Sequence, residues 1–78
     1  MKLSARVRGD WFAVPCKGTE TVKWLGDETL RRYYKAKSTS GHATEKVYEV
    51  RKAKGGAILD MDDCIKHVLD DNDFITVG

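Results

Sequence analysis

Residues 3–16 read LSARVRGDWFAVPC, and this stretch decides the fold because it predicts a β-hairpin. Apolar and polar residues alternate on both sides of Gly9-Asp10, a pair typical of a two-residue turn. The pairs that this turn would form are Arg8–Trp11, Val7–Phe12, Ala5–Val14 and Leu3–Cys16. The last three pairs place only apolar side chains on one face, so register and burial agree. The opposite face then carries Arg6, Arg8 and Trp11.

The next residues, TETVKWLGDETLRRYYKAK at 19–37, predict one long helix. Its expected buried stripe, at spacings of three and four, consists of Val22, Leu25, Thr29, Tyr33 and Ala36. Acidic residues lie early and basic residues late, as the helix dipole favours. Thr19 or Thr21 is placed to cap the first turn, and Gly26 would let the helix approach the sheet closely. Pro15 has no N–H to donate, which predicts that the second strand of the hairpin lies at a sheet edge.

Shorter patterns complete the domain. The expected elements are a strand at 45–52 (EKVYEVRK), a strand at 57–60 (AILD), a short helix at 62–69 (DDCIKHVL) and a strand at 74–77 (FITV). In the short helix Ile65, Val68 and Leu69 would point inward, and residues 38–46 would form a loop. The resulting order, β-β-α-β-β-short α-β, predicts an α+β fold of the ubiquitin-like β-grasp type. We expect residues 1–78 to form one such domain, a piece of a longer chain.

The bulk composition restricts the class of protein. Seventy-eight residues with 41% hydrophobic and 33% charged content are typical of one small folded domain rather than a disordered tail. No apolar run approaches the ~20 residues that a membrane span needs, and no charged-then-apolar leader opens the chain. Cys16 and Cys64 form neither a Cys-x-x-Cys pair nor a disulfide framework, so we expect both to be reduced. These features favour a cytoplasmic protein without a membrane partner.

The net charge of +2 hides an asymmetry along the chain. Residues 1–54 hold thirteen Lys or Arg and six Asp or Glu, a local charge of +7. Residues 55–78 hold one Lys and six Asp, a local charge of −5. A nucleic-acid-binding domain usually leaves its basic field unopposed, so nucleic acid is a disfavoured partner. The division favours contact between unlike surfaces, including those of two copies of the chain.

Six aspartates gather in residues 59–73, LDMDDCIKHVLDDND, and define a predicted acidic patch. Its members are Asp60, Asp62, Asp63, Asp70, Asp71 and Asp73. A calcium-binding EF loop that began at Asp60 would need glycine sixth and glutamate twelfth, where this chain has Ile65 and Asp71. Catalytic carboxylates need a pocket that separates their pKa values, which so small a chain offers poorly. Two interpretations remain: solvated or turn-capping aspartates, and a patch that faces a partner.

The remaining candidate sites are a Cys/His pair and a basic face. Cys64 and His67 are three residues apart on the predicted short helix, but two ligands do not make a zinc site and Cys64 is expected to face the core. We therefore predict no metal, no catalytic residue and no cofactor within this chain. Arg6 and Arg8 are expected to project beside Trp11, where a guanidinium stacked on the indole contributes ~0.5–1 kcal/mol. This basic face would be either a solvated sheet face or a docking surface for carboxylates.

Several blocks of the sequence resemble a known family. VRGDWFAVPC and TVKWLGDETLRRYYK are similar to the N-terminal segment of animal histidine ammonia-lyases. VPCKG, RRYYKAK and GGAILDMDDCIKHVLDDND also resemble the N-terminal domain of the partitioning-defective polarity scaffold, to which the lyase segment is related. The resemblance covers nearly all of residues 3–77, and the RGDWFAVPC…WLGDETLRRY block favours the lyase over the scaffold.

The resemblance implies a cytosolic parent enzyme that eliminates ammonia from L-histidine to give urocanate, in histidine catabolism. Such lyases are mainly helical homotetramers, and their methylidene-imidazolone electrophile forms from an internal Ala-Ser-Gly. The present chain has no Ala-Ser-Gly; its nearest approach is STSGH, with Thr39 before Ser40-Gly41. The resemblance therefore predicts a non-catalytic N-terminal domain of a histidine ammonia-lyase. A ubiquitin-type modifier is excluded because such proteins end in Gly-Gly, whereas Gly55-Gly56 is internal.

The resemblance to the polarity scaffold implies a partner as well. In that scaffold the related domain self-associates front to back, like Phox/Bem-type domains, by joining a basic sheet face to an acidic loop-and-helix patch. By position the six aspartates match the acidic side, and Arg6 and Arg8, with Lys2 or Lys17, would supply the basic side. The expected partners are a second copy, in a weak and salt-sensitive contact, or the catalytic body of the parent lyase. The expected function is interaction or oligomerisation of a histidine ammonia-lyase; the alternative is a self-associating domain of a polarity-scaffold-type protein.

Overall fold

The computed structural model describes residues 1–37 and 46–78. Its first two strands, β1 (Lys2–Val7) and β2 (Asp10–Pro15), form the predicted hairpin. The turn consists of Arg8 and Gly9 rather than Gly9 and Asp10, and both turn residues have positive φ angles, 51° and 90°. The predicted register is therefore wrong: Val7 pairs with Asp10, and Ala5 with Phe12. Because every partner moves by two residues, the predicted buried face is unchanged.

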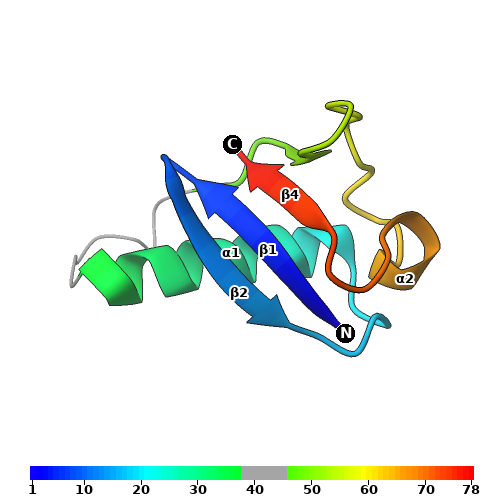
Figure 1. The fold of residues 1–78 in the computed structure, drawn as a ribbon, viewed down its shortest axis with the longest axis horizontal. Coiled ribbons are helices and arrows are strands. Elements are labelled where there is room, and N and C mark those ends of the chain that lie inside the picture. Colours follow the sequence, from blue (N-terminus) through cyan, green and yellow to red (C-terminus); the bar gives the residue numbers. More distant parts are fainter. Residues whose placement is uncertain (38–45) are drawn as a thin grey trace.

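The four strands form one mixed sheet in the order β2-β1-β4-β3 (Figure 1). The last strand, β4 (Phe74–Val77), lies parallel to β1, and β3 (Val50–Lys52) lies antiparallel to β4. Strand β2 is at the edge, which confirms the position predicted from Pro15. Buried and accessible residues alternate along β1 and β4, so the sheet has one covered face and one open face.

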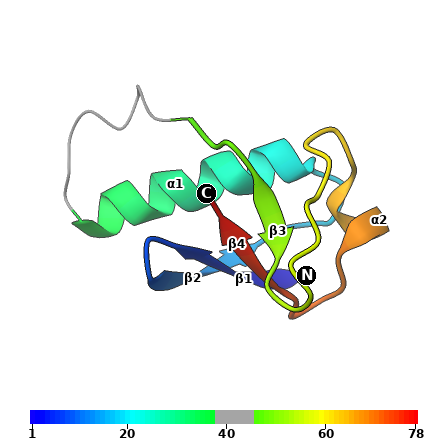
Figure 2. The same ribbon diagram turned by 90° about the horizontal axis from the view of Figure 1, so that it is seen from above.

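Helix α1 (Val22–Lys37) covers one face of the sheet (Figure 2). Thr21 Oγ1 accepts a 3.1 Å hydrogen bond from the Trp24 N–H, which confirms one of the two predicted caps. The buried residues of the helix are Val22, Leu25, Gly26, Thr29, Leu30 and Tyr34. The predicted stripe is right in its first half and wrong in its second, because Tyr33 is half-buried and Ala36 is exposed. The buried row advances in steps of four from Val22 to Tyr34, and so drifts away from the predicted row.

Gly26 allows the close approach between helix and sheet that the sequence predicts. A Cβ atom added at Gly26 would lie 2.9 Å from Val47 Cγ1 and 3.3 Å from Val50 Cγ2. Any larger residue would therefore push α1 away from β3. The fully buried side chains of the core include Leu3, Val14, Leu25, Ile65 and Ile75, contributed by both hairpin strands, both helices and β4.

Residues 57–60 do not form the predicted strand. Only an isolated bridge joins Ile58 to Arg51 of β3. The pairing stays short because the Gly55-Gly56 turn precedes it and a turn at Asp60 follows it, where the Asp62 N–H donates a 2.8 Å hydrogen bond to Asp60 Oδ1. Of the predicted strand at 45–52, residues 46–49 are not in a strand, β3 remains, and residue 45 lies outside the described residues. The predicted loop at 38–46 also lies outside them except for its last residue.

The short second helix, α2 (Ile65–Val68), is confirmed, with Ile65 and Leu69 buried and Val68 half-buried. The architecture is therefore α+β, a mixed four-stranded sheet crossed by one long helix, and agrees with a ubiquitin-like grasp. Across residues 1–37 and 46–78, no helix is long and apolar enough to span a membrane.

Candidate functional site

The open face of the sheet presents a row of side chains that crosses all four strands. Directly paired positions in neighbouring strands point to the same side of a sheet. Trp11 pairs with Arg6, Arg6 with Thr76, and Thr76 with Arg51. The isolated bridge places Ile58 opposite Arg51, at the end of this row.

Two aromatic rings meet on this face. Phe74 lies one row away, opposite Ser4 of β1. Its ring centroid is 5.4 Å from that of Trp11, and the ring planes are 82° apart, the edge-to-face geometry that aromatic pairs favour. Trp11 is 48% exposed and Phe74 is 55% exposed, so the pair is open to solvent. Arg6, Trp11, Arg51, Ile58 and Phe74 are called the open-face cluster below.

The two arginines of the open-face cluster differ in their bonding. Arg6 lies beside the indole as predicted, with its guanidinium carbon 5.9 Å from the Trp11 ring centroid. Arg51 donates hydrogen bonds from Nε to Glu49 Oε1 at 3.0 Å and from Nη1 to the Gly56 carbonyl at 3.1 Å. Among the described residues, no hydrogen bond or ion pair holds the Arg6 guanidinium. Of the two arginines in the open-face cluster, Arg6 is therefore the one that is available to a partner.

Arg8 does not lie on this face, so its predicted place beside Trp11 is wrong. Arg8 Nη1 donates a 3.1 Å hydrogen bond to Tyr34 Oη. Its guanidinium carbon also lies 5.2 Å from the ring centroid of Tyr33 and 5.8 Å from that of Tyr34. Both tyrosines belong to α1, on the covered side of the sheet. Because the hairpin turn begins at Arg8, this residue leaves the alternation of β1 and its side chain turns toward the helix.

Three of the six aspartates serve the backbone of the fold. The bonds are Asp62 N–H to Asp60 Oδ1 at 2.8 Å, Lys2 N–H to Asp71 Oδ1 at 2.7 Å and Asp70 N–H to Asp73 Oδ2 at 2.8 Å. The turn-capping interpretation is therefore confirmed for Asp60 and Asp73, whereas Asp71 accepts the N–H of Lys2 at the start of β1. The side chains of Asp62, Asp63 and Asp70 are exposed, and within the described part of the chain no hydrogen bond or ion pair involves their carboxylates.

The aspartates form two turns that flank α2 at one end of the molecule (Figure 2). The turn at 60–63 packs against the start of α1, where the Val22 N–H donates a 2.9 Å bond to the Asp63 carbonyl. The turn at 70–73 packs against the start of β1, where the Asn72 N–H donates a 2.8 Å bond to the Lys2 carbonyl. Exposed Lys66 lies on α2 between the two turns. The acidic patch is thus divided along the chain into two turns, with α2 and its exposed Lys66 between them in the sequence.

Other chemistry finds little support in the described residues. Within ranges 1–37 and 46–78, no group of three or more His, Cys, Asp or Glu could hold a metal ion. Both cysteines are free; Cys64 is half-buried, and its Sγ donates a 3.2 Å bond to the Gly18 carbonyl. Burial, followed by the charge of Glu20, raises the pKa of the Cys16 thiol and so disfavours its reactive thiolate.

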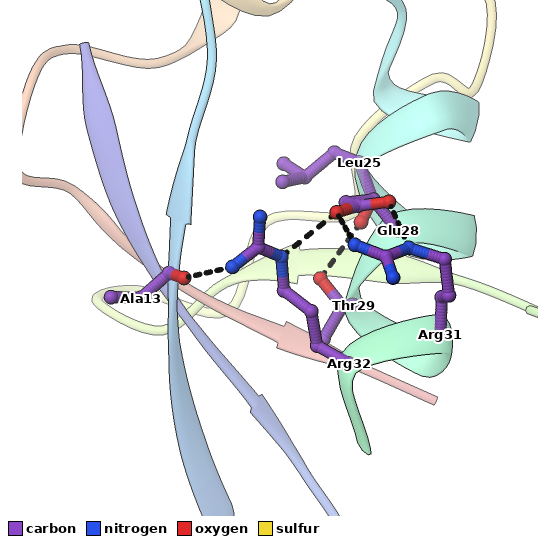
Figure 3. A network of polar contacts seen from close by, with 6 residues as sticks. All are labelled: Ala13, Leu25, Glu28, Thr29, Arg31 and Arg32. Carbon is purple, nitrogen blue, oxygen red and sulfur yellow. Dashed lines mark hydrogen bonds and ion pairs between the residues drawn. The ribbon is translucent and has the colours of Figure 1, made fainter. Parts of the chain in front are cut away.

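A polar network on α1 was missed by the sequence reasoning (Figure 3). Glu28 accepts hydrogen bonds from Arg31 Nε at 2.8 Å, Arg31 Nη2 at 2.7 Å and Arg32 Nε at 2.8 Å. The two bonds from Arg31, and then the one from Arg32, lower the pKa of Glu28 from 4.5 to about 2 despite the opposing effect of burial. Arg32 Nη1 also donates a 3.2 Å bond to the Ala13 carbonyl of edge strand β2. The spacings of three and four residues would have indicated the ion pairs, though not the bond to the strand.

Phe74 and Ile58 were also absent from the predicted site. The alternation of FITV places Phe74 and Thr76 on one face of the strand and the buried Ile75 and Val77 on the other, so this pattern indicates an exposed Phe74. No local signal indicates that Phe74 meets Trp11, because their contact depends on the order of the strands.

Comparison with known proteins matches residues 1–77 to the family described as the N-terminal of Par3 and HAL proteins. The histidine ammonia-lyase of Rattus norvegicus is 42% identical over 80 residues, which cover 97% of this chain and 12% of the lyase. The Homo sapiens histidine ammonia-lyase is 40% identical with the same coverage, and that of Caenorhabditis elegans is 29% identical over 100% of this chain and 11% of the lyase. The chain therefore spans only about an eighth of the length of these relatives. These matches confirm the resemblance to histidine ammonia-lyases, and the chain belongs to the family of N-terminal domains of Par3 and HAL proteins.

Proposed function

We propose that this chain is the N-terminal interaction domain of a histidine ammonia-lyase and that it takes no part in the elimination of ammonia. The match covers 97% of this chain but only 12% of a lyase, so most of the length of such an enzyme lies outside the matched region. The chain also lacks the Ala-Ser-Gly from which the electrophile of these lyases would form. The parent protein is expected to act in the cytoplasm on L-histidine, without nucleic-acid or membrane partners.

The observation that carries this proposal is the open-face cluster. Trp11 and Phe74 keep about half of their surfaces in water although they contact one another. Exposed aromatic side chains that are grouped, rather than scattered singly, mark surfaces for other proteins. Arg6 adds a cation to the same face, and Arg and Trp are both frequent in energetically dominant interface positions.

Deletion of residues 1–78 from the full-length lyase tests the proposal. Turnover per assembled active site should be retained, while the oligomeric state or the melting temperature should change. The assay combines urocanate formation, followed by absorbance, with light scattering to confirm assembly. A deletion variant that assembles normally yet loses turnover would show that the domain contributes to the chemistry, contrary to the proposal.

Front-to-back self-association is a second candidate, supported by the uncommitted carboxylates of Asp62, Asp63 and Asp70 at the α2 end. In this arrangement the carboxylates of one copy would face Arg6 of the next. Sedimentation velocity of the 78-residue chain at low and high salt is the appropriate measurement. A mass that rises with concentration and falls with salt supports the contact, and a monomer under all conditions refutes it.

A further inference from the structure

We propose that the open-face cluster docks onto the remainder of the parent lyase chain, at a segment that presents an apolar side chain next to a carboxylate. The inference rests on the proposed function, because it names the partner of that interaction domain. Three observations support it: the exposed side chains of the open-face cluster, the poor match that a second copy of this domain offers to them, and the greater length of the related lyases.

The first requirement on the partner is an apolar side chain. Trp11, Phe74 and Ile58 are 48%, 55% and 62% exposed, and all three lie on the same face of the sheet. The Trp11–Phe74 pair leaves ring surface uncovered on the outer side, where only another apolar group can exclude water. Carboxylates alone would leave that surface wet.

The second requirement is a carboxylate. Arg6 has no hydrogen-bonding or ion-pair partner among the described residues, whereas the guanidinium of Arg51 is already held by Glu49. The outward positions of the four strands include Lys2, Arg6 and Arg51 but no Asp or Glu. A guanidinium that becomes desolvated in an interface needs an acceptor, and a carboxylate supplies the strongest one.

A second copy of this domain meets one requirement but not both. Its acidic turns offer Asp62, Asp63 and Asp70, yet no large apolar side chain is exposed between residues 59 and 73. Two open faces packed against each other would cover the rings but would bring the cations together. Tyr48 is 85% exposed, but it lies near Lys46, and its neighbour Glu49 already pairs with Arg51.

The remainder of the lyase chain is the partner that covalent linkage favours. The domain matches only 12% of the length of a relative, so a body several times larger is attached to it in such proteins. Tethering raises the effective concentration of one partner at the other to about the millimolar range. A face of only a few side chains can therefore be occupied without high intrinsic affinity.

Hydroxyl-radical footprinting of the full-length lyase, read residue by residue by mass spectrometry, tests whether the face is covered. Phe74 is the reporter, because the ring that lies beside the substituted Arg6 is that of Trp11. Tyr48, which is 85% exposed, is the internal reference for an exposed ring. Phe74 should be protected in the wild-type enzyme, should become reactive in an Arg6→Glu variant and should stay protected in a Lys35→Glu control, which reverses an exposed charge on α1. Equal reactivity of Phe74 in wild type and Arg6→Glu overturns the proposal.

An Arg6→Lys variant identifies the occupant. It keeps the positive charge and supplies an amine that carbodiimide joins to a neighbouring carboxylate. A cross-link from Lys at this position to an Asp or Glu beyond the N-terminal domain is the expected result. A cross-link to Asp62, Asp63 or Asp70 of another copy, or no cross-link at all, overturns the inference. The deletion experiment stays independent, because turnover without the domain does not depend on which partner the domain contacts.

Discussion

Replacement of Glu28 by Gln removes the negative charge that holds Arg31 and Arg32 on α1, while nearly preserving the shape of the side chain. Glu28 receives three hydrogen bonds from Arg31 and Arg32, and Arg32 continues the network to the Ala13 carbonyl. We expect Glu28→Gln to lower the free energy of unfolding by about 1–1.5 kcal/mol at neutral pH.

The magnitude follows from the pKa of Glu28 and from the exposure of its partners. At about 1.36 kcal/mol per pKa unit, the fall from 4.5 to about 2 sets a ceiling of about 3.4 kcal/mol. Arg31 is 55% exposed, so water and salt screen its contribution, while Arg32 is 32% exposed and Glu28 15% exposed. The Gln amide oxygen also retains one acceptor for an arginine, which brings the expected loss to less than half of the ceiling.

The sign of the pH dependence is set by the direction of this shift. The pKa of Glu28 is lower in the folded state than in the unfolded state, so its stabilisation is fully present above about pH 5. The stabilisation is lost progressively as the pH falls from 4.5 to about 2. In this range Glu28 is protonated first in the unfolded state, and below it Glu28 is protonated in both states. The stability difference between wild type and Glu28→Gln should shrink over that range.

Urea denaturation of the 78-residue chain, followed by tryptophan fluorescence at several pH values, provides the measurement. Asp27→Asn is the matched control, because Asp27 is 57% exposed and, within residues 1–37 and 46–78, forms an ion pair with Lys23 alone, at 3.5 Å. That control should change the free energy of unfolding by no more than about 0.5 kcal/mol. A wild-type to Glu28→Gln difference that stays constant from neutral pH to about pH 2.5, or that equals the Asp27→Asn effect, would refute the reasoning.

Two further predictions concern caps. Thr21→Ala should destabilise the chain by about 1 kcal/mol, because the Trp24 N–H loses its acceptor. Thr19→Ala, at an exposed position, should have little effect. Equal urea midpoints for the two variants would contradict this assignment of the cap. Asp73→Ala should lower the free energy of unfolding by about 0.5–1.5 kcal/mol, because the Asp73 carboxylate accepts the Asp70 N–H. Asp70→Ala removes a carboxylate that makes no hydrogen bond or ion pair among the described residues, so it should have a smaller effect. A lower melting temperature for Asp70→Ala than for Asp73→Ala refutes the capping role.

The hairpin shows what alternation in a sequence determines and what it does not. The alternation of apolar residues assigned Leu3, Ala5 and Val7 to the covered face correctly. It could not choose between adjacent turns, since moving the turn by one residue shifts the pairing by two and leaves the faces intact. The difference matters for the residues beside the turn: Arg8 passes from strand to turn and reaches Tyr34, and Asp10 passes from turn to strand β2. An error in register that leaves the buried face unchanged therefore accounts for the wrong placement of Arg8, one of the three residues predicted for the basic face.

The open-face cluster needed information that no local pattern holds. Trp11 and Phe74 are 63 positions apart, and their rings meet because β1 lies between β2 and β4 while β4 runs parallel to β1. Ile58 joins the same face through a bridge that was predicted as a full strand. Periodicity indicates which residues of each strand face outward, but the order of the strands decides which of those residues become neighbours.

The number of aspartates in the sequence overestimates the number of carboxylates that are available to a partner. Half of them accept backbone N–H groups in the turns at 60–62 and 70–73 and at the start of β1, so their presence is explained by the fold itself. The three that remain are divided between two turns, with Lys66 between them. Exposed charges at such positions contribute mainly to the rate and salt dependence of an encounter. The open-face cluster, by contrast, presents two aromatic rings and the Arg6 guanidinium, which no hydrogen bond or ion pair holds among the described residues. Burial of such rings, with a carboxylate for the guanidinium, is what stabilises a complex. The site of stable contact is therefore expected on the aromatic face, with the acidic turns confined to steering.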